Sequence, residues 1–152
     1  MADRMLDLVF ARLADPEVGV VVSSADVAEV DRVARRVEAL RLALVARADA
    51  QQVHRRSGHS STSAWVASVT RSGGAAAQRE VGLATALAGG LDRTREAFEA
   101  GEVSGSNARI VVKTMDKLPK TLTSVDREKV EAALVRDARR LEPGRLDRAA
   151  KM

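Results

Sequence analysis

The sequence predicts an all-α protein, and two features of its composition carry that prediction. Alanine, leucine and arginine, which are among the strongest helix formers, are abundant, whereas aromatic residues make up 2% of the chain and tyrosine is absent. Valine is common, but it recurs mostly at helical spacing. At 152 residues the chain has the length of one ordinary domain. We therefore expect a single helical domain over residues 1–152, with about seven to eight helices and a core of leucine, valine and alanine.

The first helix is expected over residues 2–14. Met5, Val9 and Leu13 recur at helical spacing, and Asp15-Pro16 should end the helix because the residue before a proline avoids the α region. Residues 18–22 form a short apolar run, which fits either an extended segment or a packed one.

The longest helix is expected over about residues 25–56, with Ser23, Ser24 or Asp26 as its N-cap. Apolar residues follow a heptad-like spacing along it, at Val30, Val33, Val37, Leu40 and Leu44. This stripe suits a helix packed against a helical body, or a coiled-coil dimer. The run is short for a coiled coil, so packing within the chain is the preferred interpretation and a homodimer through the long helix is the alternative.

Glycine, serine and proline divide the rest of the chain into shorter helices. Ser57-Gly58-His59-Ser60 ends the long helix, and Ser60 or Ser61 can cap a short helix over about 61–70 with Ala64, Trp65 and Val69 facing inward. A turn at residues 71–74 leads to a helix over about 75–88. Further helices are expected over about 91–100, 104–118, 122–140 and 145–151.

The helix pair at about 61–88 has the outline of a helix-turn-helix. In that motif the second helix enters the DNA major groove, and side chains near its N-terminus reach base edges. Those side chains are Ser72, Gln78 and Arg79 here, with Arg71 beside the turn. Glutamine can pair with adenine, and arginine with guanine, through two hydrogen bonds each. Two short helices joined by a glycine turn also occur in ordinary bundles, so a purely structural role stays open.

A basic stretch surrounds this pair, because the sequence has no acidic residue between Asp49 and Glu80. Arg55 and Arg56 lie within it and are expected to contact phosphates, although a solvated basic face is an equal alternative. Farther along, Arg109 and Lys113 stand four residues apart and belong to a second basic stripe. Double-stranded DNA is therefore the expected partner.

The sequence predicts no catalytic site, metal, cofactor or small-molecule substrate. It has no cysteine, and His54 and His59 form no evident metal site with a carboxylate. No glycine-rich phosphate loop follows a strand, and no nucleophile elbow is present. No apolar stretch approaches the length that spans a bilayer, so we expect a cytoplasmic protein without membrane contact.

Two sets of motifs resemble one particular family. The first is the run 61–67 with Thr70 and the apolar residues of 77–87, and the second is the run 97–104 followed by 107–110 and Leu118-Pro119. Together they resemble the domain of unknown function 222, also called the 13E12 repeat family, over about residues 28–150. This family is abundant in actinobacteria and their mobile elements. Its members typically carry the helical region in front of a C-terminal HNH endonuclease domain.

The resemblance implies a non-catalytic, DNA-engaging helical module from the N-terminal part of a longer protein, whose nuclease domain lies beyond residue 152. The chain departs from the family pattern at the turn. The family usually has glycine at the position of Arg71 and a serine cap at the position of Gly73. We therefore expect a shifted turn in which Ser72 caps the second helix.

Overall fold

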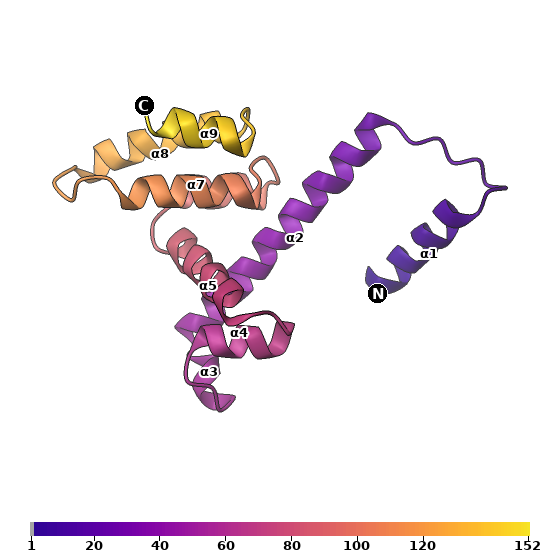
Figure 1. The fold of residues 1–152 in the computed structure, drawn as a ribbon, viewed down its shortest axis with the longest axis horizontal. Helices are drawn as coiled ribbons and strands as arrows, with labels where there is room; N and C mark the ends of the chain where they lie inside the picture. Colours follow the sequence, from indigo (N-terminus) through magenta and orange to yellow (C-terminus); the bar gives the residue numbers. More distant parts are fainter. Residues whose placement is uncertain (1) are drawn as a thin grey trace. The chain divides into compact units, whose positions relative to one another are not determined.

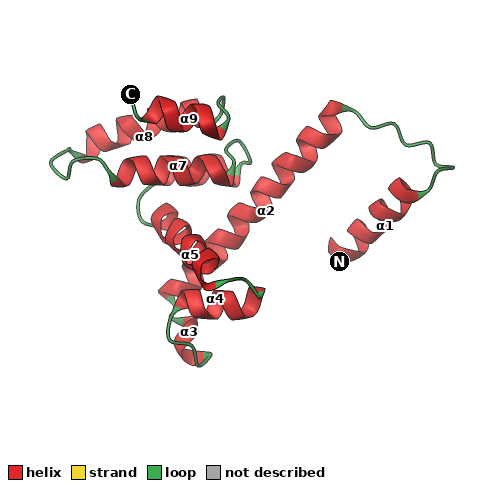
Figure 2. Cartoon of the chain, viewed as in Figure 1, coloured by secondary structure: helices red, strands yellow, loops and turns green. Residues whose placement is uncertain are grey.

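The computed structural model describes residues 2–152, which form helices and connecting segments without any strand (Figure 2). This confirms the all-α prediction. The described residues contain nine helices rather than seven or eight, because the long helix is divided and the other predicted helices are all present. The chain forms two units, residues 1–31 and residues 32–152. A single domain over 1–152 stays a prediction.

The first unit contains helix α1 (Ala2–Ala14), at the predicted bounds, and the start of helix α2 (Ser24–Ala50). Its segment 18–22 is neither helical nor packed, and its side chains are exposed. The start of α2 is capped reciprocally. The Ser23 N–H donates to Asp26 Oδ2 over 2.8 Å, and the Asp26 N–H donates to Ser23 Oγ over 3.3 Å. The hydrogen bonds that the Asp26 carboxylate accepts, first from the Ser23 N–H and then from the Ser23 hydroxyl, hold the pKa of Asp26 below its ordinary value.

The predicted long helix ends early, and its last turn is a separate element. Helix α2 stops at Ala50, and helix α3 (Val53–Arg56) follows. Gln52 separates them because it takes the left-handed conformation, with φ of 52°. A sequence pattern gives no warning of this break, since glutamine is an ordinary helix former.

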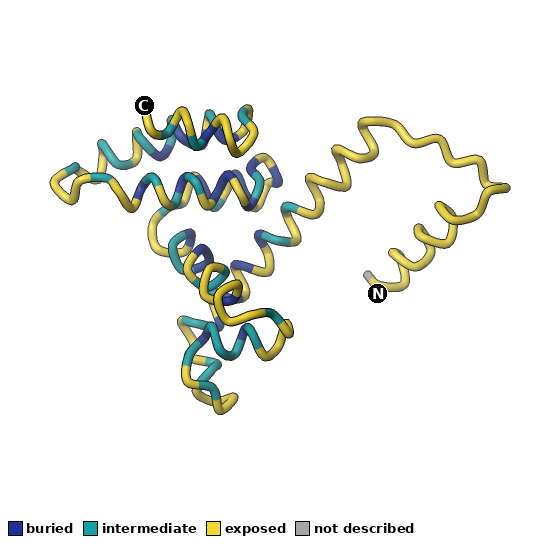
Figure 3. Tube along the Cα trace, in the orientation of Figure 1, coloured by how far each residue is buried: buried dark blue, intermediate teal, exposed yellow. Residues whose placement is uncertain are grey.

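The prediction that the heptad-like stripe of α2 packs within the chain is wrong. Val30, Val33, Val37, Leu40 and Leu44 are all exposed. The buried residues of α2 are Ala39, Leu42, Val45 and Ala48, which share another face of the helix. Along α2, burial is confined to the half of the helix that leads into α3 (Figure 3). The physical reason is that this face joins the core formed by Leu83, Leu87 and Phe98, which the stripe does not reach.

Helices α4 (Thr62–Thr70) and α5 (Gly74–Ala88) form the predicted pair and pack against each other. Ser61 caps α4, because its hydroxyl accepts the Ala64 N–H over 3.1 Å. Trp65 is half-buried against the core, whereas Val69 is 64% exposed, so the prediction that Val69 faces inward is wrong. Val66 takes the buried position instead, one helical turn after Thr62.

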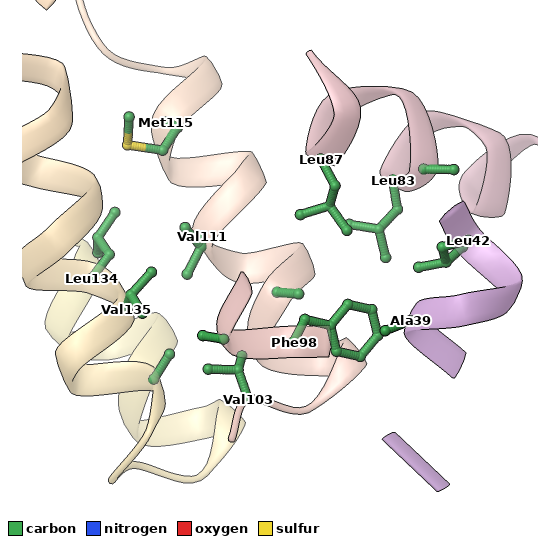
Figure 4. Close-up of a cluster of buried hydrophobic side chains, with 14 of the residues drawn as sticks. Ala39, Leu42, Leu83, Leu87, Phe98, Val103, Val111, Met115, Leu134 and Val135 are labelled. Atoms are coloured by element: carbon green, nitrogen blue, oxygen red, sulfur yellow. The ribbon is translucent and has the colours of Figure 1, made fainter. Parts of the chain in front are cut away.

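The remaining helices are α6 (Asp92–Glu99), α7 (Gly105–Asp116), α8 (Ser124–Ala138) and α9 (Pro143–Ala150). Helices α7, α8 and α9 lie side by side (Figure 1). Phe98 of α6 is fully buried and lies near Ala39 and Leu42 of α2 and Leu83 of α5 (Figure 4). Small buried residues recur through this core, as expected for a chain poor in aromatic residues: Ala39, Ala77, Ala84, Ala97, Ala108 and Ala138.

The turn between α6 and α7 needs a glycine. Gly101 has φ of +78°, and a Cβ there would lie 2.7 Å from the Arg32 carbonyl oxygen of α2. Arg36 of α2 also reaches this turn, where its Nε donates to the Glu99 carbonyl over 3.1 Å. A basic side chain is stabilising at the C-terminal end of α6, because the last carbonyls of a helix lack intrahelical donors and carry partial negative charge. The turn is therefore fixed against α2 by close backbone approach and by hydrogen bonding.

Candidate nucleic-acid interface

The turn between α4 and α5 is tight and places an arginine at its apex. Arg71 takes the left-handed conformation, with φ of 52°, and its side chain is exposed. The Ser72 N–H returns to the Ala67 carbonyl over 3.1 Å and closes the end of α4. A glycine would suit this conformation without strain, because it has no Cβ. Arg71 therefore adds a charge at the expense of backbone strain.

The prediction that Ser72 caps α5 is wrong. Gly73 is the N-cap, and it supplies no side-chain hydrogen bond. The Ser72 hydroxyl instead lies 2.9 Å from the Thr70 hydroxyl. The left-handed turn at Arg71 directs Ser72 back toward α4, which leaves the first N–H groups of α5 without a serine cap.

The start of α5 is open and carries no negative charge. Residues 74–76 are exposed glycine and alanine, the first turn has no acidic side chain, and the Cα atoms of Gly73 and Gly74 face open space. Gln78 and Arg79 are exposed directly after this turn. The N-terminal end of a helix carries partial positive charge and free N–H groups that suit a phosphate. The same small side chains would let α5 approach a nucleic acid closely.

The two acids that border the basic stretch are both engaged with other side chains. Glu80 receives two hydrogen bonds from Arg41 of α2, at 2.5 Å from Nε and 2.7 Å from Nη2. Asp49 accepts the Thr62 hydroxyl proton over 2.5 Å. A paired carboxylate repels an incoming phosphate less than a free one does. Residues 50–79 therefore keep their positive character where α4 and α5 begin.

A buried hydroxyl fixes α3 against the start of α4. Thr62 is 5% exposed, and its Oγ1 lies 3.1 Å from Nδ1 of His54. Since the hydroxyl proton goes to Asp49, His54 Nδ1 must be the donor in this second bond. Helix α3 is thereby held with Arg55 and Arg56 exposed. They lie at the opposite end of α4 from Arg71, about 13 Å along a nine-residue helix.

The structure brings Arg79 and Arg109 to one hollow, which Lys113 does not line. A hollow of about 340 Å³ is lined by Arg41, Arg79 and Arg109, with Glu38 and Glu80. Arg109 Nη2 lies 3.8 Å from Glu38 Oε1, so this arginine is only loosely paired.

Lys113 lies one turn farther along α7, opposite α9. There the pKa of Asp147 is lowered, first by a hydrogen bond from Lys151 and further by the charges of Lys113 and Lys117. These three lysines form a second basic area beside α9. Lys113 thus belongs to a different surface from the α4–α5 turn.

Two contributors to the interface were not predicted from the sequence. Arg41 neutralises Glu80 from α2, and Thr62 anchors α3 through a histidine and an aspartate. The sequence offers no specific signal for Arg41, because its partner lies 39 residues away. A polar cluster at the helix break could have been sought from the sequence, because Asp49, His54 and Thr62 lie close together in the chain.

The described part of the chain has no group of three histidine, aspartate or glutamate side chains placed to hold a metal ion. None of the helices in residues 2–152 is long and apolar enough to cross a membrane.

The fold and this surface define an all-α protein with an exposed, basic helix-turn-helix-like pair. The chain belongs to the family described as Domain of unknown function (DUF222), whose pattern matches residues 24–152. This confirms the resemblance drawn from the motifs at 61–67 and 97–110. No curated protein and no solved structure matches the chain.

Proposed function

We propose that this chain is a non-catalytic helical module that engages double-stranded DNA through the α4–α5 turn and the start of α5. The observation that carries the proposal is the joint exposure of Arg71, Gln78 and Arg79 around an acid-free helix N-terminus. Arg55 and Arg56 would contact phosphates from the other end of α4. The family resemblance supports a place beside an HNH nuclease domain.

Helix α5 is suited to a major groove by its shape as well as its charge. The groove is about 12 Å wide and admits one α-helix. The exposed face of α5 at residues 74–76 has only glycine and alanine, so the helix axis can lie deep. Gln78 and Arg79 then supply the long side chains that pair with adenine and guanine. Arg71 at the turn is placed for a backbone phosphate.

The proposal is tested by fluorescence anisotropy with a labelled duplex. We expect Arg71→Ala combined with Arg79→Ala to weaken binding at low salt, because the base contact of Arg79 is lost, and to reduce the salt dependence, because the phosphate contact of Arg71 is lost. The matched control is Arg136→Ala combined with Arg140→Ala, which removes the same charge from two exposed arginines, one on α8 and one just after it. Equal losses of affinity in the two double variants would mean that binding depends only on net charge, which would contradict the proposed interface.

A second candidate function is self-association through α2, and one observation favours it. Val33, Val37, Leu40 and Leu44 are 46–63% exposed at heptad spacing on the second unit. A contiguous exposed apolar stripe of this kind commonly marks an interaction surface. A hollow of about 420 Å³, lined by Val33, Val37 and Leu40 among others, lies on the stripe.

Analytical ultracentrifugation at micromolar concentration tests this second candidate. We expect a dimer that becomes a monomer in the Val37→Glu and Leu44→Glu double variant, since each glutamate would be buried unpaired in the seam. The control is Ser68→Glu, at an exposed position on α4. A monomeric native chain at the highest concentration tested would remove the dimer version.

A further inference from the structure

The exposed apolar stripe of α2 is short and has a defined register. Within residues 32–152 its members follow the a and d positions of a heptad repeat, and they are Val33, Val37, Leu40 and Leu44. Arg47 takes the next position of the repeat and ends the stripe. The four apolar positions span three turns of helix, or about 17 Å. The direction of a partner helix on this seam decides which side chains meet.

Each flank of the stripe carries one arginine and one alanine. Ala34 and Arg41 take the e positions on one flank. Arg36 and Ala43 take the g positions on the other flank, and all four residues are exposed. Side chains at e and g positions border a partner helix and set its orientation. Each flank therefore offers one long cation and one small residue, two turns apart.

A parallel second copy would bring arginines together at both edges of the seam. In a parallel coiled coil the g side chain of one helix meets the e side chain five residues later on the other, so Arg36 would face Arg41. Arg41 is held by Glu80 of α5, to which its Nε and Nη2 donate over 2.5 and 2.7 Å, so it is not free to turn away. Repulsion between like charges therefore disfavours the parallel arrangement.

An antiparallel second copy matches the volumes of the seam. With the two-fold axis between Val37 and Leu40, these two residues pack against each other across the axis. Val33 then packs against Leu44 of the second copy. Every layer of the seam holds one valine and one leucine, so the layers have equal volume and leave no gap.

The flanks also match in the antiparallel arrangement, where g positions face g positions and e positions face e positions. Arg36 then faces Ala43 of the second copy, and Arg41 faces Ala34, so each long side chain meets a small one. Ala43 and Glu99 line the same hollow of about 420 Å³. Arg36 of the second copy would therefore enter this hollow beside a carboxylate, which adds charge complementarity.

We propose that a second copy of this chain packs antiparallel on the α2 stripe, with the two-fold axis between Val37 and Leu40. The inference rests on the self-association proposed above and adds its direction and register. The seam covers only three turns, so we expect an interface below about 1,200 Å², in the range of weak and reversible complexes. The two copies should therefore associate at micromolar concentration and exchange freely.

Disulfide trapping tests the direction, because the native chain has no cysteine. The samples are Val33→Cys, Leu44→Cys and their equimolar mixture, oxidised in a glutathione buffer, and the intact mass identifies each dimer. A disulfide needs Cα atoms about 4.4–6.8 Å apart. The antiparallel register brings positions 33 and 44 together and keeps identical positions about 17 Å apart along the axis. We expect the mixed disulfide in at least about tenfold excess over either homotypic one. Ser68→Cys mixed with Val33→Cys measures random collisions, since Ser68 is exposed on α4.

Charge at one flank gives a second readout. Position 43 faces Arg36 of the second copy, so Ala43→Glu should strengthen the dimer about threefold and Ala43→Arg should weaken it about tenfold in sedimentation. The same two substitutions at Ser68 are the control for net charge. In a parallel dimer position 43 would face Ala48, which is buried, and the two variants would differ no more than the control pair does.

Three results would overturn the inference, and they differ in what else they remove. Homotypic disulfides at position 33 and at position 44 would mean a parallel dimer, and self-association through α2 would then stand. A monomeric native chain, with no disulfide above the Ser68→Cys background, would remove self-association as well. If the two cysteines also resist alkylation in that monomer, another segment of the same chain covers the stripe.

Discussion

Arg71→Gly should make the protein more stable and, at the same time, a poorer ligand for DNA. Arg71 holds φ of 52° at the end of α4, in a region that costs a residue with a Cβ roughly 1–2 kcal/mol. Glycine loses part of this gain through its greater freedom in the unfolded chain, about 0.5–1 kcal/mol. The net expectation is a stabilisation of about 0.5–1 kcal/mol, or a rise in Tm of about 1–4 °C for a chain of this length.

The weaker DNA binding expected of Arg71→Gly follows from the loss of counterion release. Each phosphate contact contributes about 0.9 to the slope of log affinity against log salt, so Arg71→Gly should reduce the slope by about one. Thermal unfolding followed by circular dichroism measures the first effect, and anisotropy at several salt concentrations measures the second. The control is Arg71→Ala, which removes the same charge but keeps a Cβ in the left-handed region.

Two results would contradict this reasoning. If Arg71→Gly is less stable than the native chain, the arginine side chain makes a stabilising contact that outweighs the strain. If Arg71→Gly and Arg71→Ala both leave the salt slope unchanged, Arg71 does not contact phosphate.

Three further predictions concern the supporting structure. Thr62→Val removes the hydroxyl shared by an aspartate and a histidine, and it should cost about 1–3 kcal/mol in urea unfolding, whereas Thr62→Ser should cost much less. Asn107→Asp replaces an amide that donates to two carbonyls, each at 2.8 Å, with a group that cannot donate, and we expect a loss of at least about 2 kcal/mol in the same assay. The cap at Asp26 should be fully present above about pH 4 and be lost as the pH falls through its lowered pKa, because protonation removes the charge that accepts the Ser23 N–H. The amide shift of Ser23 in an NMR pH titration follows this loss, and a midpoint at or above the ordinary aspartate value would contradict it.

Local signals in the sequence predicted most of the helices, although not the break at Gln52. Ser61, Ser104 and Thr123 each cap the helix that follows, as their types predict, and Pro143 begins α9. The exposed positions of Arg71, Gln78 and Arg79 also follow from the turn and the helix period. These features depend on a few neighbouring residues, which is why one sequence is enough to find them.

The features that the sequence did not predict depend on contacts between distant residues. The apolar stripe of α2 has the stronger pattern, but the alanine-containing face is the one that is buried, because the fit to α5 and α6 decides which face packs. The break at Gln52 and the pairing of Arg41 with Glu80 are likewise set by partners elsewhere in the fold. The effect of Lys113 on Asp147 depends in the same way on where α9 lies, and α9 is encoded some 30 residues later.

The most direct test of the central claim is the salt dependence of duplex binding by the native chain, measured by fluorescence anisotropy between low and near-physiological salt. Three arginines on phosphate, at positions 55, 56 and 71, predict a slope of about −2.7 in log affinity against log salt. A slope of about −2 to −3 would support engagement of DNA through this surface. No binding at low salt, or affinity that does not change with salt, would contradict it, and self-association through α2 would become the leading explanation of the exposed surfaces.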